Sequence, residues 1–175
     1  MVASPLSIRP ACLEDAKILA DLGVQTFRET FEGLYPPSEL AAFLAGAYGE
    51  AIQSAELADS ARPALVLEMQ GLPVGFAQLR LGHREAGVPG EHPAELQRIY
   101  LLRSAQGGGR GAVLLSASMA LARTWEADTL WLGVWEHNAK ALAFYARNGF
   151  REVGEHVFQI GQQRDRDLIL ARELP

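Results

Sequence analysis

The sequence has very little cysteine, with Cys12 as the single example among 175 residues. One cysteine forms no internal disulfide and cannot supply a cage of thiolates for zinc, so we expect a reducing compartment, most simply the cytoplasm. The chain also lacks an apolar run near the roughly 20 residues that span a bilayer, and its first ten residues have no apolar core of the signal-peptide type. These absences predict a soluble protein with no membrane partner.

Basic charge is scarce as well. There are 16 lysines and arginines against 21 aspartates and glutamates, which gives a formal net charge of −5. Binding to a nucleic acid duplex needs a basic face, so we expect no nucleic acid partner and favour cationic or neutral ligands. The four histidines, at 83, 92, 137 and 156, show no metal-ligand spacing, and no metal site is predicted.

Apolar residues, in contrast, are plentiful. They make up 49% of the chain and charged residues 21%, close to the average for globular proteins and unlike a disordered chain. We therefore predict one domain that spans residues 1–175 and is long enough to bury a real core.

Periodicity and turn signals give an order of elements along the chain. Strands are expected at 6–9, 64–69, 73–81, 94–102 and 129–135, followed by a final hairpin of 150–161 and 165–171. Helices are expected from Glu14 to about Gly33, from Pro37 to about Ala58, from Gly111 to about Trp125 and from Asn138 to Asn148. Long antiparallel stretches with one crossover predict an α+β fold with a mixed sheet.

The strongest local signal is a glycine-rich turn between an expected strand and helix, Gln106-Gly107-Gly108-Gly109-Arg110-Gly111. Glycine allows positive φ and close approach of the backbone, and successive N–H groups at a helix N-terminus bind anions. A phosphate-bearing cofactor is the natural occupant; the simpler alternative is a flexible turn.

Two phosphate-binding motifs compete for this turn. The ATP loop needs Lys followed by Ser or Thr after its last glycine, and here Arg110-Gly111 stands instead. The dinucleotide fingerprint matches Gly107, Gly109 and Ala112 in its relaxed form. However, its acidic residue belongs about 20 residues further on, whereas Glu136 lies 29 residues beyond Gly107.

A third pattern fits better. Gln106, Gly109 and Gly111 match the Arg/Gln-x-x-Gly-x-Gly/Ala signature of the GCN5-related N-acetyltransferases, the GNAT superfamily. The segment 131–150, with Asn138, Tyr145 and Gly149-Phe150, resembles the second signature of that superfamily. The resemblance implies a GNAT fold with a mostly antiparallel sheet of six to seven strands and about four helices. It also implies an enzyme that moves an acetyl group from acetyl-CoA to the primary amine of a small molecule.

Within the superfamily, the chain looks most like the bacterial PaiA-type spermidine/spermine N-acetyltransferases. The similar segments are 26–31, 95–101, 131–136, 157–161 and 167–169, so the resemblance covers nearly the whole chain. It implies a polyamine-like acceptor. Gly108 departs from the pattern, because that branch usually has Lys at this position.

The resemblance also implies the cofactor contacts. Coenzyme A would bind along the fourth strand, the glycine turn and the last helix, through Ile99, Tyr100, Leu101, Gln106, Gly107, Gly108, Gly109, Arg110, Gly111, Asn138 and Tyr145. The backbone N–H of Leu101 would stabilise the oxyanion. Tyr145, two helical turns after Asn138, would protonate the leaving thiolate, unless it is simply a core residue.

Three carboxylates are candidates for handling the amine. Glu95 would act as base, directly or through a water, although a plain surface carboxylate fits the sequence equally well. Glu29 and Glu32 would hold a cationic amine, or belong to an ordinary solvated helix face. Cys12 is interpreted as structural, which favours direct transfer in a ternary complex.

Two functions from other classes remain open at this point. One is a non-catalytic acyl-CoA-binding regulatory domain, and the other is a dinucleotide-binding protein. The retention of Tyr145 and Asn138 favours the enzyme. A homodimer is also left open, because many members of the superfamily dimerise.

Overall fold

The structure is a computed structural model that describes residues 6–175, so the expectation about the first ten residues lies partly outside the described part. One mixed sheet has the strand order β1-β2-β3-β4-β5-β7-β6. The strands are β1 (Leu6–Pro10), β2 (Ala64–Met69), β3 (Leu72–Leu81), β4 (Pro93–Leu101), β5 (Thr129–Trp135), β6 (Arg151–Ile160) and β7 (Gln163–Glu173). The seven strands and their mostly antiparallel pairing confirm the expected fold class.

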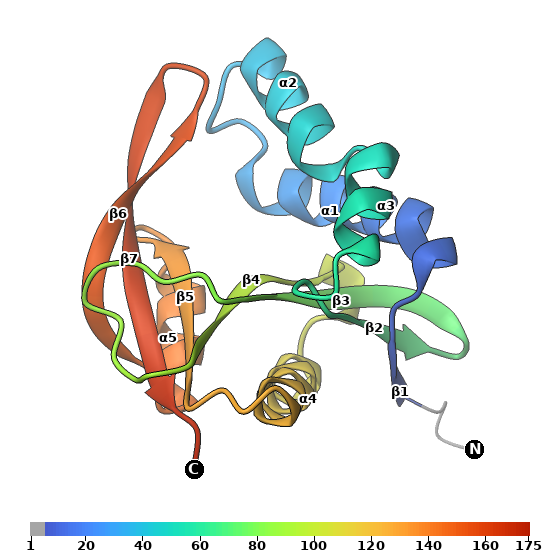
Figure 1. Cartoon of the computed structure of the whole chain (residues 1–175). Coiled ribbons are helices and arrows are strands. Elements are labelled where there is room, and N and C mark those ends of the chain that lie inside the picture. The colour runs from blue at the N-terminus through green and yellow to red at the C-terminus, as the bar shows by residue number, and fades with distance from the viewer. Residues whose placement is uncertain (1–5) are drawn as a thin grey trace.

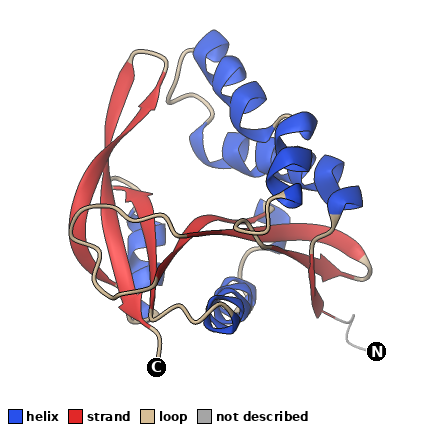
Figure 2. Cartoon of the chain, viewed as in Figure 1, coloured by secondary structure: helices blue, strands red, loops and turns tan. Residues whose placement is uncertain are grey.

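Helices cover both faces of this sheet. They are α1 (Ala16–Phe31), α2 (Pro37–Tyr48), α3 (Glu50–Ala58), α4 (Arg110–Thr124) and α5 (Ala139–Arg147). Helices α1, α2 and α3 lie above the sheet in Figure 1, and α4 lies below it. Helix α5 is seen behind β5 and β7 and packs in the same apolar cluster as α4. Figure 2 shows the same layers by element type. No helix within residues 6–175 is long and apolar enough to cross a membrane.

The segment 37–58 forms two helices rather than the single one expected from the sequence. Gly49 has extended backbone angles, φ −58° and ψ 143°, and it ends α2 and starts α3. Its backbone closely approaches α2, since an added Cβ would lie 2.7 Å from the carbonyl oxygen of Ala45. The described residues therefore hold five α-helices, where about four were expected.

The sheet opens between its two central strands. Strands β4 and β5 run parallel but pair only at Pro93–Thr129, Ala94–Leu130 and Glu95–Trp131. Beyond these pairs the two strands diverge, and the sheet divides into a β1–β4 half and a β5–β7–β6 half (Figure 1). Past this point the facing edges of β4 and β5 have no sheet partner. This leaves an opening between the two strands.

Two apolar clusters hold the layers together, one on each face. The upper cluster packs α1 and α2 on the sheet through Phe27, Leu44 and Phe76. The lower cluster packs α4 under it through Leu115 and Leu130. On α1, Ala16, Ala20, Val24, Phe27 and Phe31 recur at spacings of three and four, and all five lie partly or fully buried in this arrangement.

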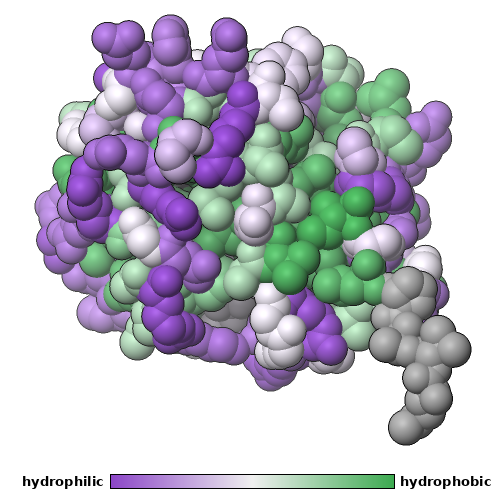
Figure 3. Space-filling view, turned by 90° about the horizontal axis from the view of Figure 1, so that it is seen from below, coloured by the Kyte–Doolittle hydropathy of each residue, from purple (hydrophilic) through white to green (hydrophobic). Residues whose placement is uncertain are grey.

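The loop 82–92 between β3 and β4 partly covers the sheet. Val88 is buried against the fully buried Trp131, and Trp131 Nε1 donates a hydrogen bond to the His83 carbonyl at 3.2 Å. In Figure 1 the loop crosses the strands β5 and β7. The opposite face, seen in Figure 3, is more apolar on the side of β1–β3 than on the side of β5–β7.

A buried ionic network fixes α3 and the end of α2 on the sheet. The Arg98 guanidinium donates to Glu56 Oε2 and to Gln78 Oε1, each at 2.5 Å, and to the Ala47 carbonyl at 3.2 Å. It also lies over the Tyr48 ring, 5.0 Å from the ring centroid. Removing this cation leaves Glu56 with Arg62 alone, at 3.1 Å, as its cationic partner and takes the donor from the buried Gln78 Oε1.

We therefore expect Arg98→Ala to lower the free energy of unfolding by about 1.5–3 kcal/mol, as for the loss of hydrogen bonds to a charged group. Denaturant unfolding followed by circular dichroism measures this loss. The matched control is Arg151→Ala, whose exposed ion pair with Glu173 at 2.8 Å should contribute nothing measurable. Equal stabilities for the two variants would contradict a structural role for the Arg98 network.

Candidate active site

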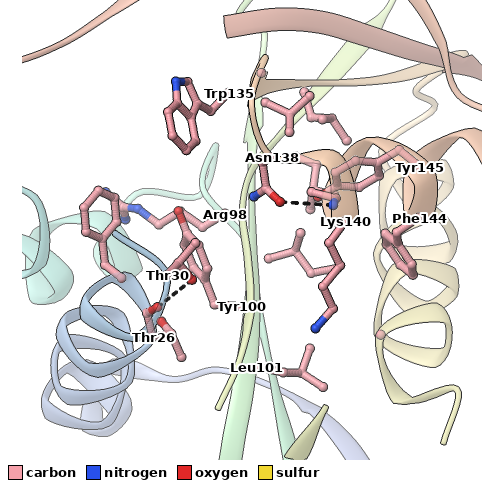
Figure 4. Close-up of a pocket in the computed structure, with 18 of the residues that line it drawn as sticks. Thr26, Thr30, Arg98, Tyr100, Leu101, Trp135, Asn138, Lys140, Phe144 and Tyr145 are labelled. Carbon is pink, nitrogen blue, oxygen red and sulfur yellow. Dashed lines mark hydrogen bonds between the residues drawn. The ribbon is translucent and has the colours of Figure 1, made fainter. Parts of the chain in front are cut away.

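The divergence of β4 and β5 produces a cleft with a volume of about 1000 Å³. Its walls come from α1 and α2 on one side of the sheet and from α4 and α5 on the other. Figure 4 shows Asn138, Lys140 and Tyr145 on one side of this cleft and Thr26 and Thr30 on the other. The cleft brings together segments from nearly the whole length of the chain.

The backbone of β4 lines the middle of the cleft. Leu102 N donates to the Val74 carbonyl at 2.9 Å, and Tyr100 is paired with Phe76 on β3. Bonding direction alternates along an antiparallel pair, so Ile99 and Leu101 direct their N–H groups to the other side, toward the cleft. The Leu101 carbonyl faces the same way, because it accepts from Gln106 Nε2 at 3.3 Å.

The glycine turn lies at the start of α4, at one end of the cleft. Gly107, Gly108 and Gly109 all have positive φ, at 87°, 58° and 78°. A Cβ added at Gly107 or Gly109 would meet nothing within 4 Å, and both residues line the cleft. The first-turn N–H groups of a helix have no intrahelical acceptors, so this turn presents donors to an open space.

Two other glycines of the turn differ from Gly107 and Gly109 in their surroundings. Gly108 does not line the cleft; a Cβ there would lie 3.3 Å from Arg110 Nη1. Gly111 lies inside α4 with ordinary φ, and its Cβ would lie 3.4 Å from the Phe144 ring. Gly111 also lines the cleft, and a Cβ there would be in ordinary van der Waals contact with α5.

Cationic side chains surround this end of the cleft. Arg103, Arg110, Lys140 and Arg147 all line it. Lys140 Nζ donates to Gln106 Oε1 at 2.5 Å, and Arg110 Nη1 donates to the Gly107 carbonyl at 3.2 Å. Together with the N-terminus of α4, they provide a positive environment that suits a phosphorylated ligand in an otherwise acidic protein.

Helix α5 supplies the two residues expected from the second sequence signature. Asn138 caps the helix, since its Oδ1 accepts from Ala141 N at 3.1 Å. Tyr145 packs against Phe144 and Phe150, with ring centroids 5.2 and 5.6 Å away, and also lines the cleft. Burial raises the pKa of the Tyr145 phenol, so it keeps its proton at neutral pH.

The other end of the cleft has aromatic walls. The rings come from α1, α2, the loop between them, β5 and β6: Phe31, Tyr35, Phe43, Tyr48, Trp135 and Phe158. Phe31 meets Trp135 edge-on at 6.1 Å, and Phe43 meets Phe158 edge-on at 5.6 Å. Such walls bind apolar groups and, through the ring faces, cations.

The three carboxylates singled out from the sequence have different positions. Glu95 lines the cleft, is buried, and accepts from Arg80 Nε at 2.6 Å; it is not a surface carboxylate. Glu29 also lines the cleft, where its Oε2 accepts from Arg103 N at 2.7 Å and fixes the segment after β4. Glu32 is outside the cleft and pairs with Arg28 at 3.5 Å, so the structure does not bring it to the site.

Among the polar residues of the cleft that sequence reasoning missed are His156 on β6 and Asp167 on β7. They are paired across the final hairpin, with His156 Nε2 3.6 Å from Asp167 Oδ2. Strand alternation places His156 and Phe158 on one face of β6. This alternation could be seen in the sequence. Which face of β6 points into the cleft, however, depends on the pairing of β6 with β7 and of β7 with β5.

Comparison with known proteins shows the family to which this chain belongs. Residues 24–150 match the model of the acetyltransferase (GNAT) family. The chain belongs to the GNAT family of acetyltransferases. An uncharacterized N-acetyltransferase of Lactobacillus delbrueckii subsp. lactis is 33% identical over 150 residues, 86% of this chain and 87% of that one. An uncharacterized N-acetyltransferase of Mycobacterium bovis is 32% identical over 162 residues, 93% of this chain and 99% of that one.

Solved structures agree on the fold of this GNAT protein. The PaiA N-acetyltransferase of Thermoplasma acidophilum, in complex with coenzyme A, superposes with a TM-score of 0.76 at 21% identity, over 97% of this chain and 99% of that one. The ribosomal-protein-S18-alanine N-acetyltransferase of Escherichia coli gives 0.71 at 19% identity, over 97% and 94%. The fold is thus confirmed, and membership of the acetyltransferase family supports acetyl-CoA as the cosubstrate.

Proposed function

We propose that this GNAT acetyltransferase transfers the acetyl group of acetyl-CoA to the primary amine of a small molecule, directly and within a ternary complex. The observation that supports this best is the single cleft between β4 and β5. It has a glycine turn with cationic neighbours at one end and aromatic walls at the other. A non-catalytic acyl-CoA-binding domain would need only the first of these two ends.

The residues present fit coenzyme A. Its phosphates would lie against the N-terminus of α4, where Gly107 and Gly109 leave room and Arg110 and Lys140 supply positive charge. Its pantetheine arm would pair with the free edge of β4 at Ile99 and Leu101, as an added strand pairs with a sheet edge. When bound, acetyl-CoA supplies the activated thioester.

Three groups of the chain would act on that thioester. The Leu101 N–H, directed into the cleft, would donate to the developing oxyanion. The Tyr145 phenol would donate its proton to the departing sulfur. Glu95, held by Arg80, would contribute a fixed negative charge beside the incoming amine. Asn138 and the packing of Tyr145 on Phe150 keep α5 in place for this transfer.

Direct transfer is favoured over an acetylated enzyme because the cleft offers no thiol. The single cysteine, Cys12, precedes the short helical turn Leu13–Asp15 and does not line the cleft. Its Sγ contacts Asp15 Oδ2 at 3.3 Å, and neighbouring Glu14 and Asp15 raise the pKa of its thiol. A thiol that is less ionised is a poorer nucleophile.

For the acceptor we propose a small amine that carries positive charge, with a polyamine as the first class to test. The aromatic walls and the acids Glu29, Glu95 and Asp167 favour a cation. A structural neighbour is a PaiA enzyme, although another acts on an alanine of ribosomal protein S18, so the fold alone does not choose between acceptors.

An acceptor panel tests this proposal. Free-thiol release from acetyl-CoA is followed with spermidine, an arylalkylamine, a free amino acid and a peptide with N-terminal alanine. We expect the highest kcat/KM for spermidine or the arylalkylamine. Preference for the peptide would overturn the small-amine acceptor while leaving the acetyltransferase in place.

A further inference from the structure

His156, which has no role in the chemistry proposed above, lies beside the point where the sheet opens. His156 is on β6, and its side chain is 29% exposed toward the cleft. Its Nε2 is 3.6 Å from Asp167 Oδ2 on β7, and its Nδ1 is 3.8 Å from Glu85 Oε1 in the loop 82–92. The imidazole is thus held between two carboxylates from two different elements.

Gly133 of β5 makes room for this ring. A Cβ at Gly133 would lie 3.0 Å from His156 Nε2 and 3.5 Å from Asp167 Oδ2. Gly133 comes two residues after Trp131, the last β5 residue paired with β4. The imidazole therefore lies over the backbone at the start of the opening, on the face of β6 that also presents Phe158 to the aromatic walls.

The burial of Asp167 suits it to orient a positively charged partner. The residue is nine-tenths buried, and its Oδ1 has no hydrogen-bond partner within residues 6–175. A buried carboxylate oxygen without a donor is costly unless a nearby positive charge compensates it. The His156 ring is paired with this carboxylate, with Nε2 3.6 Å from Oδ2, so protonation of His156 stabilises the pair.

Glu95 is less suited to receive a proton. Arg80 Nε donates to its Oε2 at 2.6 Å, and the side chain is only 10% exposed. Protonating Glu95 would leave the Arg80 guanidinium without its counter-charge. His156 has the opposite arrangement, because the carboxylates of Asp167 and Glu85 stabilise a proton on its ring.

We propose that His156, oriented by Asp167, accepts the proton of the incoming ammonium group, with Glu95 and Arg80 as a fixed ion pair beside it. This inference rests on the proposed function and adds to it the group that makes the amine nucleophilic.

The proton and electron balance is as follows. The ammonium N–H bond breaks and its proton goes to His156. The freed nitrogen lone pair forms the C–N bond to the acetyl carbon, and the C–S bond breaks with its electron pair going to sulfur. Tyr145 protonates the sulfur and regains a proton from the new amide nitrogen. The sum is one acetyl amide, one free thiol and one proton, which His156 releases to solvent.

The pH dependence has a definite sign. The neighbouring Asp167 carboxylate raises the pKa of His156, with smaller contributions from Glu85 and Glu95; Arg80, paired to Glu95, is the cation on that side. His156 accepts a proton only when neutral, so kcat/KM for the amine should rise with pH through the pKa of His156. Asp167→Asn removes the main raising cause and should move this limb to lower pH.

Kinetics of four variants test the assignment: His156→Gln, Asp167→Asn, Glu95→Gln and, as the matched control, His92→Gln in the exposed part of the loop. We expect His156→Gln to lower kcat/KM for the amine at least about 100-fold, with unchanged affinity for coenzyme A. Glu95→Gln should keep the acidic limb, and His92→Gln should match the unsubstituted protein.

A second readout separates proton transfer from packing. His156→Ala should regain activity when imidazole is added, and an NMR titration should show a lower pKa for His156 in Asp167→Asn. Full activity of His156→Gln, or loss of the acidic limb in Glu95→Gln alone, would overturn the assignment while leaving the acetyltransferase intact. Absence of transfer to every amine by the unsubstituted protein would instead overturn the proposed function, and this inference with it.

Discussion

Tyr145→Phe should lower turnover by roughly 10²- to 10⁴-fold, the usual contribution of general acid catalysis. The substitution removes only the hydroxyl and keeps the ring that packs on Phe144 and Phe150. Because the proton is delivered only in the transition state, the loss should be equal in kcat and in kcat/KM. Steady-state kinetics of acetyl transfer measure it, with coenzyme A affinity expected to stay the same.

The matched control for this prediction is Tyr145→Ala. Tyr145 is buried in the lower apolar cluster, so loss of the ring should lower the free energy of unfolding by about 3–5 kcal/mol. The Phe variant should change stability little. A Tyr145→Phe protein that turns over at nearly the normal rate would remove the acid from the mechanism and reduce Tyr145 to a core residue.

Gly109→Val should weaken coenzyme A binding at least roughly 100-fold, which corresponds to about 2.7 kcal/mol. Gly109 has φ 78° and caps α4 at its N-terminus, where the N–H groups face the cleft. A β-branched side chain resists this φ and would stand between the phosphates and their donors. Isothermal titration with coenzyme A measures the effect.

Gly71→Val is the control for backbone strain. Gly71 has nearly the same φ, 75°, and an equally open surrounding, but it lies in the β2–β3 turn and does not line the cleft. Both variants should lose similar stability, and only Gly109→Val should lose coenzyme A. Unchanged affinity in a folded Gly109→Val protein would contradict the phosphate-binding role of the turn.

Much of the fold could be predicted from the sequence because its signals are local. Strand β5 has the bounds that were predicted for its short apolar run, and Asn138 caps α5 as its residue type predicts. The break at Gly49 was missed, since glycine inside an apolar helical pattern has no unique meaning without its neighbours. The contact of Gly111 with Phe144 could not be predicted either, because it depends on the packing of two helices.

The two ends of the cleft differ in how far the sequence predicts them. The cofactor end is a contiguous motif, so Gln106 to Gly111 could be found by pattern. The acceptor end is assembled by long-range pairing: His156 meets Asp167 through the final hairpin, and both reach the cleft through the pairing of β7 with β5. A one-residue slip in either register would turn these side chains away, so spacing alone could not reveal them.

The most direct test of the account is thiol release from acetyl-CoA, measured with and without an amine, together with the intact mass of the protein. We predict release only when the amine is present, in equal amount to acetylated amine, with no acetyl group left on the protein. Thiol release without amine that leaves an acetylated chain would contradict direct transfer. A protein that binds coenzyme A but releases no thiol with any amine would contradict catalysis itself.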